Sequence, residues 1–120
     1  MITINVTQDK KTDSFVNHVV WSEMPLFVVM SSLSHAANKI MNESNLDRTE
    51  LYDYQPRELN DQIEIKVKPY FKDNSEFDTD LYFDRDYLSI EDVLYFIIKV
   101  GDNLIKKEER GELQWQQRFT

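Results

Sequence analysis

The stretch IEIKVKPYFKDNSEFDTDLYF, residues 63–83, decides the fold. One side of each half is built from alternate positions: Ile63, Ile65 and Val67 in the first half, and Phe77, Thr79, Leu81 and Phe83 in the second. Period two is the pattern of a strand that buries one face. The polar turn Lys72–Glu76 between the halves predicts two strands that pair antiparallel. Pro69 places its end of the first strand at a sheet edge or a bulge.

A second strand pair is predicted near the N-terminus. Ile2, Ile4 and Val6 alternate with polar residues, and residues 15–21 are again rich in strand formers. The polar segment 8–13 between them is turn-like, so the two strands are expected to form a hairpin.

Each strand pair is followed by an amphipathic helix. Apolar residues between Leu26 and Met41 fall on one arc, with Ser22 expected as the cap and Pro25 in the first turn. The second helix is expected to begin at Ile90, after a capping box made by Ser89 and Asp92. Gly111, which follows a basic last turn, is expected to end it.

The predicted order is therefore ββαββα. The fold class is α+β: residues 1–120 form a single two-layer domain in which an antiparallel sheet of about four strands packs on two amphipathic helices. Segment 42–61 is the least regular, with a short helical turn expected within 47–54. In the tail 112–120, three apolar residues alternate with polar ones, which fits an added strand or docking anchors: Leu113, Trp115 and Phe119.

Composition excludes several classes of chemistry. The chain has no cysteine, which rules out disulfides, thiolate catalysis and Cys-ligated zinc, and a cytoplasmic location is expected. No phosphate loop or nucleophile elbow occurs, and His18 and His35 fit no zinc spacing. We therefore expect a non-enzyme with no catalytic residue, no cofactor and no metal. No apolar run approaches the roughly 20 residues of a membrane span.

The strongest functional signal is the charge of residues 73–92. Eight acids against one base give this segment a net charge of −7, within a chain whose total is −8. Such a density of like charge repels itself, so a cationic partner would relieve it. We predict a partner-binding surface made by the acids of this segment and one tyrosine: Asp73, Glu76, Asp78, Asp80, Tyr82, Asp84, Asp86, Glu91 and Asp92.

The expected geometry is an outward row of carboxylates. If the apolar residues of the last strand face the core, then Asp78, Asp80, Tyr82 and Asp84 face water, about 6.8 Å apart along one face. Such a row would fit a groove built for phosphates, where Arg side chains form charge-assisted pairs with the acids.

Plainer interpretations remain open for the same residues. Charge on an edge strand blocks aggregation, acids at a helix start are ordinary capping, and an acidic surface aids solubility. A calcium loop counted from Asp78 needs Gly and Glu where the chain has Phe83 and Ser89, so an EF-hand is excluded. A group of tyrosines near acids fits either an interface or core packing: Tyr52, Tyr54, Tyr82, Tyr87 and Tyr95.

In size, acidity and lack of catalytic motifs the chain is similar to the small phage or plasmid proteins that mimic DNA, such as anti-restriction and anti-CRISPR inhibitors; the similarity covers no motif. It implies an inhibitor that blocks the nucleic-acid site of a basic protein or nuclease. One alternative is an immunity protein against a basic toxin. Another is an assembly component of a phage particle or secretion system, which would self-associate through the tail or the first strand. Direct binding of nucleic acid or an anionic membrane is not expected, because both would be repelled. Monomer and homodimer are both open.

Overall fold

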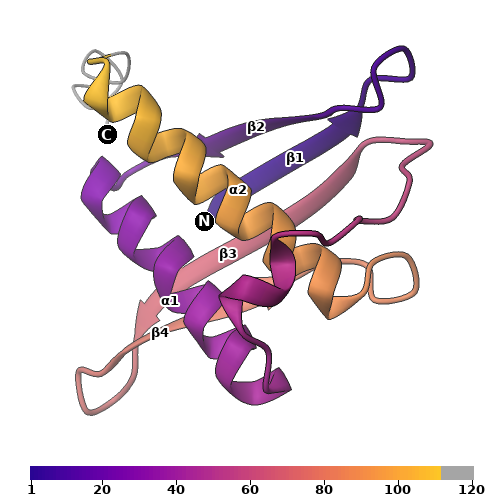
Figure 1. The fold of residues 1–120 in the computed structure, drawn as a ribbon. Helices are drawn as coiled ribbons and strands as arrows, with labels where there is room; N and C mark the ends of the chain where they lie inside the picture. The colour runs from indigo at the N-terminus through magenta and orange to yellow at the C-terminus, as the bar shows by residue number, and fades with distance from the viewer. Residues whose placement is uncertain (112–120) are drawn as a thin grey trace.

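A computed structural model describes residues 1–111 and confirms the order ββαββα and the α+β class. Figure 1 shows two helices laid across one face of a four-stranded sheet. The elements, in chain order, are β1 (Ile2–Gln8), β2 (Phe15–Trp21), α1 (Leu26–Ser44), the 3-10 helix η1 (Arg48–Leu51), β3 (Ile63–Phe71), β4 (Phe77–Tyr82) and α2 (Ile90–Glu109).

The strands lie in the order β2-β1-β3-β4, and every neighbouring pair is antiparallel. β1 is interior: Ile4 is opposite Val19 on one side and Ile65 on the other. The expected self-association through the first strand therefore cannot occur by pairing β1 with a strand of another copy, because both edges of β1 are already paired within the chain. The edges of the sheet are β2 and β4.

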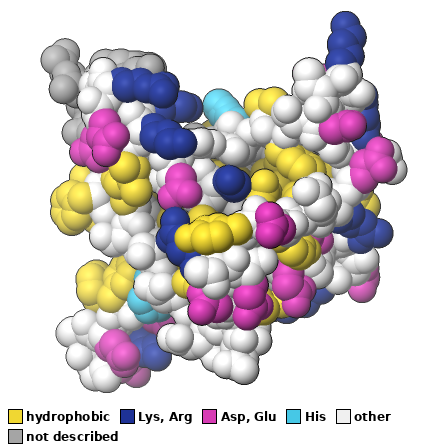
Figure 2. Space-filling view, viewed as in Figure 1, with side chains coloured by type: hydrophobic (Ala, Val, Ile, Leu, Met, Phe, Trp, Pro, Cys, Tyr) yellow, Lys and Arg dark blue, Asp and Glu magenta, His cyan; other side chains and the backbone are white. Residues whose placement is uncertain are grey.

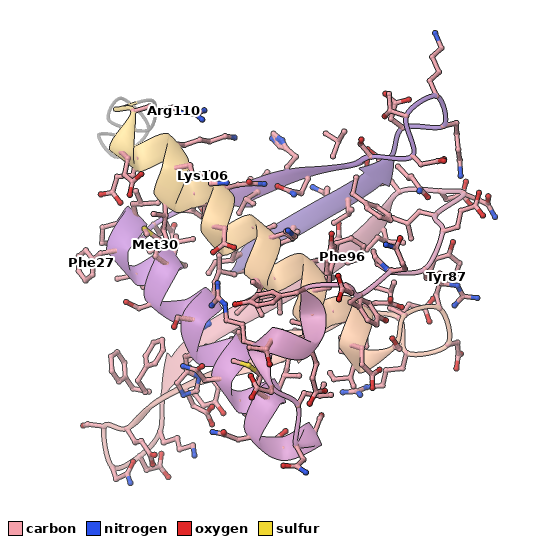
Figure 3. All side chains as sticks on the ribbon, in the orientation of Figure 1. Phe27, Met30, Tyr87, Phe96, Lys106 and Arg110 are labelled. Carbon is pink, nitrogen blue, oxygen red and sulfur yellow. The ribbon has the colours of Figure 1, made fainter. Side chains whose placement is uncertain are left out.

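One core lies between the sheet and the helices. It collects the alternating residues of the two central strands and one face of each helix, as the periodicity predicts. Phe96 on α2 is 1 % exposed, whereas Phe27 on α1 is 70 % exposed. Figure 3 shows Phe27 projecting away from the body of the molecule. The residues that alternate with these core positions along the strands, including Thr3 and Lys66, lie on the sheet face that carries no helix.

Pro69 occupies a position that does not require a backbone N–H. It lies within β3 opposite Thr79. β1 begins at Ile2, which is opposite Val67, so Pro69 lies beyond the end of β1. The expectation of an edge position is confirmed, because among the described residues no strand flanks this end of β3 on the β1 side.

The two helices differ in how they begin. α1 has Pro25 as its N-cap without a side-chain cap bond, so the expected role of Ser22 is wrong. α2 has the expected capping box, in which Ser89 Oγ accepts from Asp92 N–H at 3.1 Å. Gly111 follows α2 with φ 74°, a left-handed conformation that glycine adopts without steric cost, and confirms the predicted end.

Segment 42–61 is ordered by one helical turn and one anchor. Asp47 caps η1 by accepting from Thr49 N–H at 3.0 Å, which confirms the expected turn. Leu59 is 1 % exposed, and its N–H donates to Gln8 Oε1 at 2.8 Å. The expectation for the tail falls on residues 112–120, outside the described residues. Within 1–111, neither helix combines the length and apolar character needed to cross a membrane.

Candidate functional site: the acidic segment and the edge of β4

The nine predicted site residues come from four places in the fold. Two lie in the β3–β4 turn, three on β4, two in the loop after β4 and two in the first turn of α2. They do not form one continuous outward row. Figure 2 shows other acidic side chains on the helix side too, gathered where η1 and the start of α2 lie in Figure 1. Lys and Arg side chains gather at the opposite end of α2.

Asp78 does not face water as expected. It is 7 % exposed, and its Oδ1 accepts from Thr79 N–H at 2.8 Å and from Lys39 Nζ at 3.0 Å. Its Oδ2 lies 3.1 Å from the Tyr70 hydroxyl and 3.2 Å from Lys72 Nζ. The physical reason is that β4 is an edge strand, so the side chain of Lys39 can cross from α1 and reach it. Two lysines of the same chain therefore neutralise this carboxylate.

The titration of this cluster reflects the same contacts. The Thr79 N–H and then the Lys39 ammonium hold the pKa of Asp78 well below its usual range. Desolvation, followed by the hydrogen bond to Asp78, raises the pKa of Tyr70 to about 12. The hydrogen bond to Asp78 also raises the pKa of Lys72. Asp78 is thus a charged structural anchor at neutral pH.

Asp92 is likewise turned inward, and the expectation that it contributes to an outward surface is wrong in geometry. It is 4 % exposed. Its Oδ1 accepts from the Tyr54 hydroxyl at 2.7 Å and from Arg57 N–H at 3.1 Å, and its Oδ2 accepts from Ser89 N–H at 3.2 Å. Burial raises the pKa of Asp92, but the hydrogen bonds from Tyr54, Arg57 and Ser89 outweigh it and lower the pKa overall.

The other predicted acids remain accessible. Asp73, Asp84 and Asp86 are exposed, while Asp80 and Glu91 are half-buried. Within residues 1–111, none of these five lies within 4.0 Å of a basic nitrogen. Glu76 is exposed and lies 3.9 Å from Lys72 Nζ, a surface pair of little energetic weight. Tyr82 is 48 % exposed at the end of β4.

An acidic hollow lies where β3 begins and β4 has ended. Its volume is about 330 Å³, and three acids line it together with neutral residues only: Asp61, Gln62, Ile63, Glu64, Asp84, Tyr87 and Leu88. The β3–β4 pairing ends at Lys66 and Tyr82, and just beyond it Glu64 of β3 and Asp84 of the following loop line the same hollow. Carboxylates gathered in one hollow repel one another. Lys66 Nζ, 3.3 Å from Glu64, offsets only part of this charge.

Sequence reasoning missed Asp61 and Glu64. Asp61 lies in the irregular segment, and Glu64 has the pattern of an ordinary solvent-facing position of β3. Aligning the β3–β4 hairpin on its turn was the signal that could have brought Glu64 close to the segment after β4, since the pairing runs to Lys66 and Tyr82. The sequence pattern offers no comparable signal for Asp61.

Several of the remaining candidates for chemistry have structural partners, whereas His18 on β2 is exposed. His35 Nδ1 lies 2.9 Å from Thr79 Oγ1, but Thr79 is 1 % exposed and so cannot reach a substrate. Arg57 stacks on the Tyr87 ring at 4.5 Å and donates to the Tyr87 carbonyl. Tyr54 and Tyr95 pack together with ring centroids 5.9 Å apart, whereas Tyr52 is exposed. In the described part of the chain, no three His, Cys, Asp or Glu side chains are placed to share a metal ion.

Comparison with known proteins finds no match: no family model, no curated protein and no solved structure is significantly similar to this chain. A function must therefore be inferred from the geometry and charge of the acidic hollow and its surroundings.

Proposed function

We propose that this protein is a non-enzymatic inhibitor that occupies the cationic nucleic-acid site of a basic partner. The observation that carries the proposal is the acidic hollow, in which Asp61, Glu64 and Asp84 gather without a basic side chain in the lining. Asp86, two residues beyond Asp84, extends the negative surface.

The proposed contact follows from unbalanced charge. The fold supplies lysines to the carboxylate that it buries on β4, but it leaves Glu64 and Asp84 in the lining of one hollow, where their like charges repel. An Arg side chain of a partner that enters the hollow would remove this repulsion and form charge-assisted, bidentate hydrogen bonds with a carboxylate. Nucleic-acid sites are rich in Arg and Lys for the same reason, since those residues bind phosphates.

The contact surface differs from the one predicted from sequence. Asp78 and Asp92 are excluded, because their carboxylates already satisfy internal donors. Asp61 and Glu64 are added, and Asp80, Asp84 and Asp86 are kept. The mechanism is competition: the inhibitor and the nucleic acid bring the same sign of charge to the same cationic site, so only one binds at a time.

The test is displacement of DNA from a purified partner. The chain is used to capture proteins from a nuclease-treated bacterial lysate at about 50 mM salt, where surface electrostatics are weakly screened. Each captured nucleic-acid enzyme is then purified and bound to a fluorescent DNA duplex, and release of the duplex is followed by anisotropy. Wild type should release the duplex, and a rise in salt should weaken the effect.

A charge-matched pair of variants makes the test specific. The triple variant D61N/E64Q/D84N removes three charges from the hollow, and the control E23Q/E108Q/E109Q removes three exposed charges elsewhere. The hollow variant should lose at least tenfold in potency and the control less than threefold. Equal losses would mean that only net charge matters, and failure to release DNA from any captured enzyme would refute competition.

A further inference from the structure

The two edges of the sheet are treated differently. On β4, the outward backbone of Thr79 is covered: its N–H donates to Asp78 at 2.8 Å, and its carbonyl accepts from Lys39 at 3.0 Å. Charged side chains on an edge strand prevent pairing with another strand. β4 is therefore closed to strand addition at its centre.

Within residues 1–111, no side chain bonds to the outer edge of β2 in this way. Its seven residues, FVNHVVW, include no Asp, Glu, Lys, Arg, Pro or Gly. All seven pair with β1 on one side. Within residues 1–111 no hydrogen bond reaches the backbone on the other side, and Trp21 Nε1 is buried without an acceptor. A long, uncharged, β-branched edge of this kind is a template for another strand.

The orientation of the free backbone groups follows from the hairpin. Asp9 N–H donates to Ser14 C=O at 2.8 Å, so 9 and 14 form a hydrogen-bonded pair. Hydrogen-bonded and non-hydrogen-bonded pairs alternate in an antiparallel ladder. Val16, His18 and Val20 therefore bond toward β1, and the outward N–H and C=O groups belong to the four residues between and beside them: Phe15, Asn17, Val19 and Trp21.

We infer that a second copy of this chain pairs with β2 across a two-fold axis at His18, to form a continuous eight-stranded sheet. This register places the outward residue Asn17 opposite Val19 of the other copy, and Phe15 opposite Trp21, so all four outward residues are paired. It uses the whole strand. The inference does not depend on the proposed function, since β2 and the acidic hollow lie on different strands.

Side chains and charge favour a second copy as the occupant. Val16 and Val20 are 56 % and 51 % exposed on the helix-free face. In this register Val16 of one copy lies opposite Val20 of the other copy, so both valines lose solvent contact. Two chains of net charge −8 repel each other, and an uncharged strand is a place where they can approach closely. Isologous two-fold contacts require such self-complementarity.

Sedimentation equilibrium of the full chain, from about 5 to 200 μM at physiological salt, tests the association. The mass should rise from 14.4 kDa toward twice that value with concentration. H18K places two like charges across the axis, and V20K places a lysine opposite Val16 of the other copy on each side of the axis. Both variants should remain monomeric, with circular dichroism verifying the fold. F27K, the same change at an exposed residue of α1, should dimerise like wild type. A wild type that stays monomeric at every concentration would refute the inference.

The register has its own test, since the chain lacks cysteine. A single H18C places two thiols across the axis, where a non-hydrogen-bonded pair has Cα atoms about 4.5 Å apart, within the range for a disulfide. Mild oxidation should cross-link H18C rapidly and single V16C not at all, because the two Cα atoms at position 16 would lie more than about 10 Å apart. Cross-linking of V16C would overturn the proposed register. Dimerisation of residues 1–111 but not of the full chain would overturn the proposal as well, because it would mean that residues 112–120 occupy the β2 edge.

Discussion

Replacement of Asp92 by Ala tests whether this acid is a structural anchor. The change removes the acceptor of three hydrogen bonds, from the Tyr54 hydroxyl, Arg57 N–H and Ser89 N–H. The first turn of α2, the segment after η1 and the helix cap would all lose a partner in one substitution. We expect a larger loss of stability than for any neighbouring acid.

The magnitude follows from the contacts. Loss of a helix cap costs about 1 kcal/mol. A donor left without an acceptor costs about 1 kcal/mol at the low end of the range for buried groups, and two partly buried donors are left here, on Tyr54 and Arg57. The total is about 3 kcal/mol. A domain of 120 residues has an unfolding entropy of about 0.25 kcal/mol per degree, so Tm should fall by about 12 °C.

Thermal and urea unfolding, followed by circular dichroism, measure the loss. S89A removes the bond from Asp92 N–H to the Ser89 hydroxyl, together with the long 3.5 Å contact of that hydroxyl with the Tyr54 hydroxyl, and should cost about 1 kcal/mol. E91A, in the same turn, loses only its favourable charge near the helix N-terminus and should cost about 0.5 kcal/mol. If D92A costs no more than E91A, the hydrogen-bond network is not stabilising and the argument fails.

The stabilisation by Asp92 should also depend on pH. Because the pKa of Asp92 is lowered in the folded state, its stabilisation is complete above the unfolded value of about 3.9 and is lost as pH falls through the folded pKa. The stability gap between wild type and D92A should therefore be constant from pH 7 to about pH 5 and should narrow below about pH 4. A gap that widens in acid would contradict the assigned pKa direction.

Two further changes test other parts of the structure. Gly101 lies inside α2, and a Cβ built there meets no atom within 4 Å. G101A should therefore raise the free energy of unfolding, measured in urea, by about 0.5–1 kcal/mol. A loss of stability would mean that the helix packs more tightly at this position than described. Tyr70 should ionise near pH 12, and D78N should move its tyrosinate absorbance step toward the ordinary value near 10, since the neighbouring carboxylate disfavours the phenolate; an unchanged step would show that desolvation alone sets the shift.

The fold was predictable because local patterns and packing agree. The alternation in β1, β3 and β4 and the apolar arcs of α1 and α2 each identify one buried face, and only a two-layer arrangement buries all of them. The cap at Ser89 and the stop at Gly111 depend on neighbouring residues, so sequence reveals them. The start of α1 was misjudged, because Ser22 lies outside the helix and Pro25 precedes it directly.

The site was less predictable because it depends on contacts between distant residues. Period two places Asp78 on the helix-free side of β4, and the alternation is correct. It cannot show that Lys39, on a different element, reaches the strand edge and buries the carboxylate. Nor can it show that Tyr54 and Arg57 close over Asp92. Strand order, strand register and long side chains decide which acids remain outside.

The distribution of compensating charge separates structural acids from available ones. Asp78, which is buried, receives two lysines, and Asp92 receives three hydrogen-bond donors. Carboxylates that a fold removes from water must be compensated in this way, since an unpaired buried charge is costly. Glu64 and Asp84 line one hollow, and Lys66, which pairs with Glu64, compensates only part of their charge. An external cation can relieve only the repulsion between carboxylates that the chain itself does not compensate. The site to test is therefore the acidic hollow rather than the whole acidic segment.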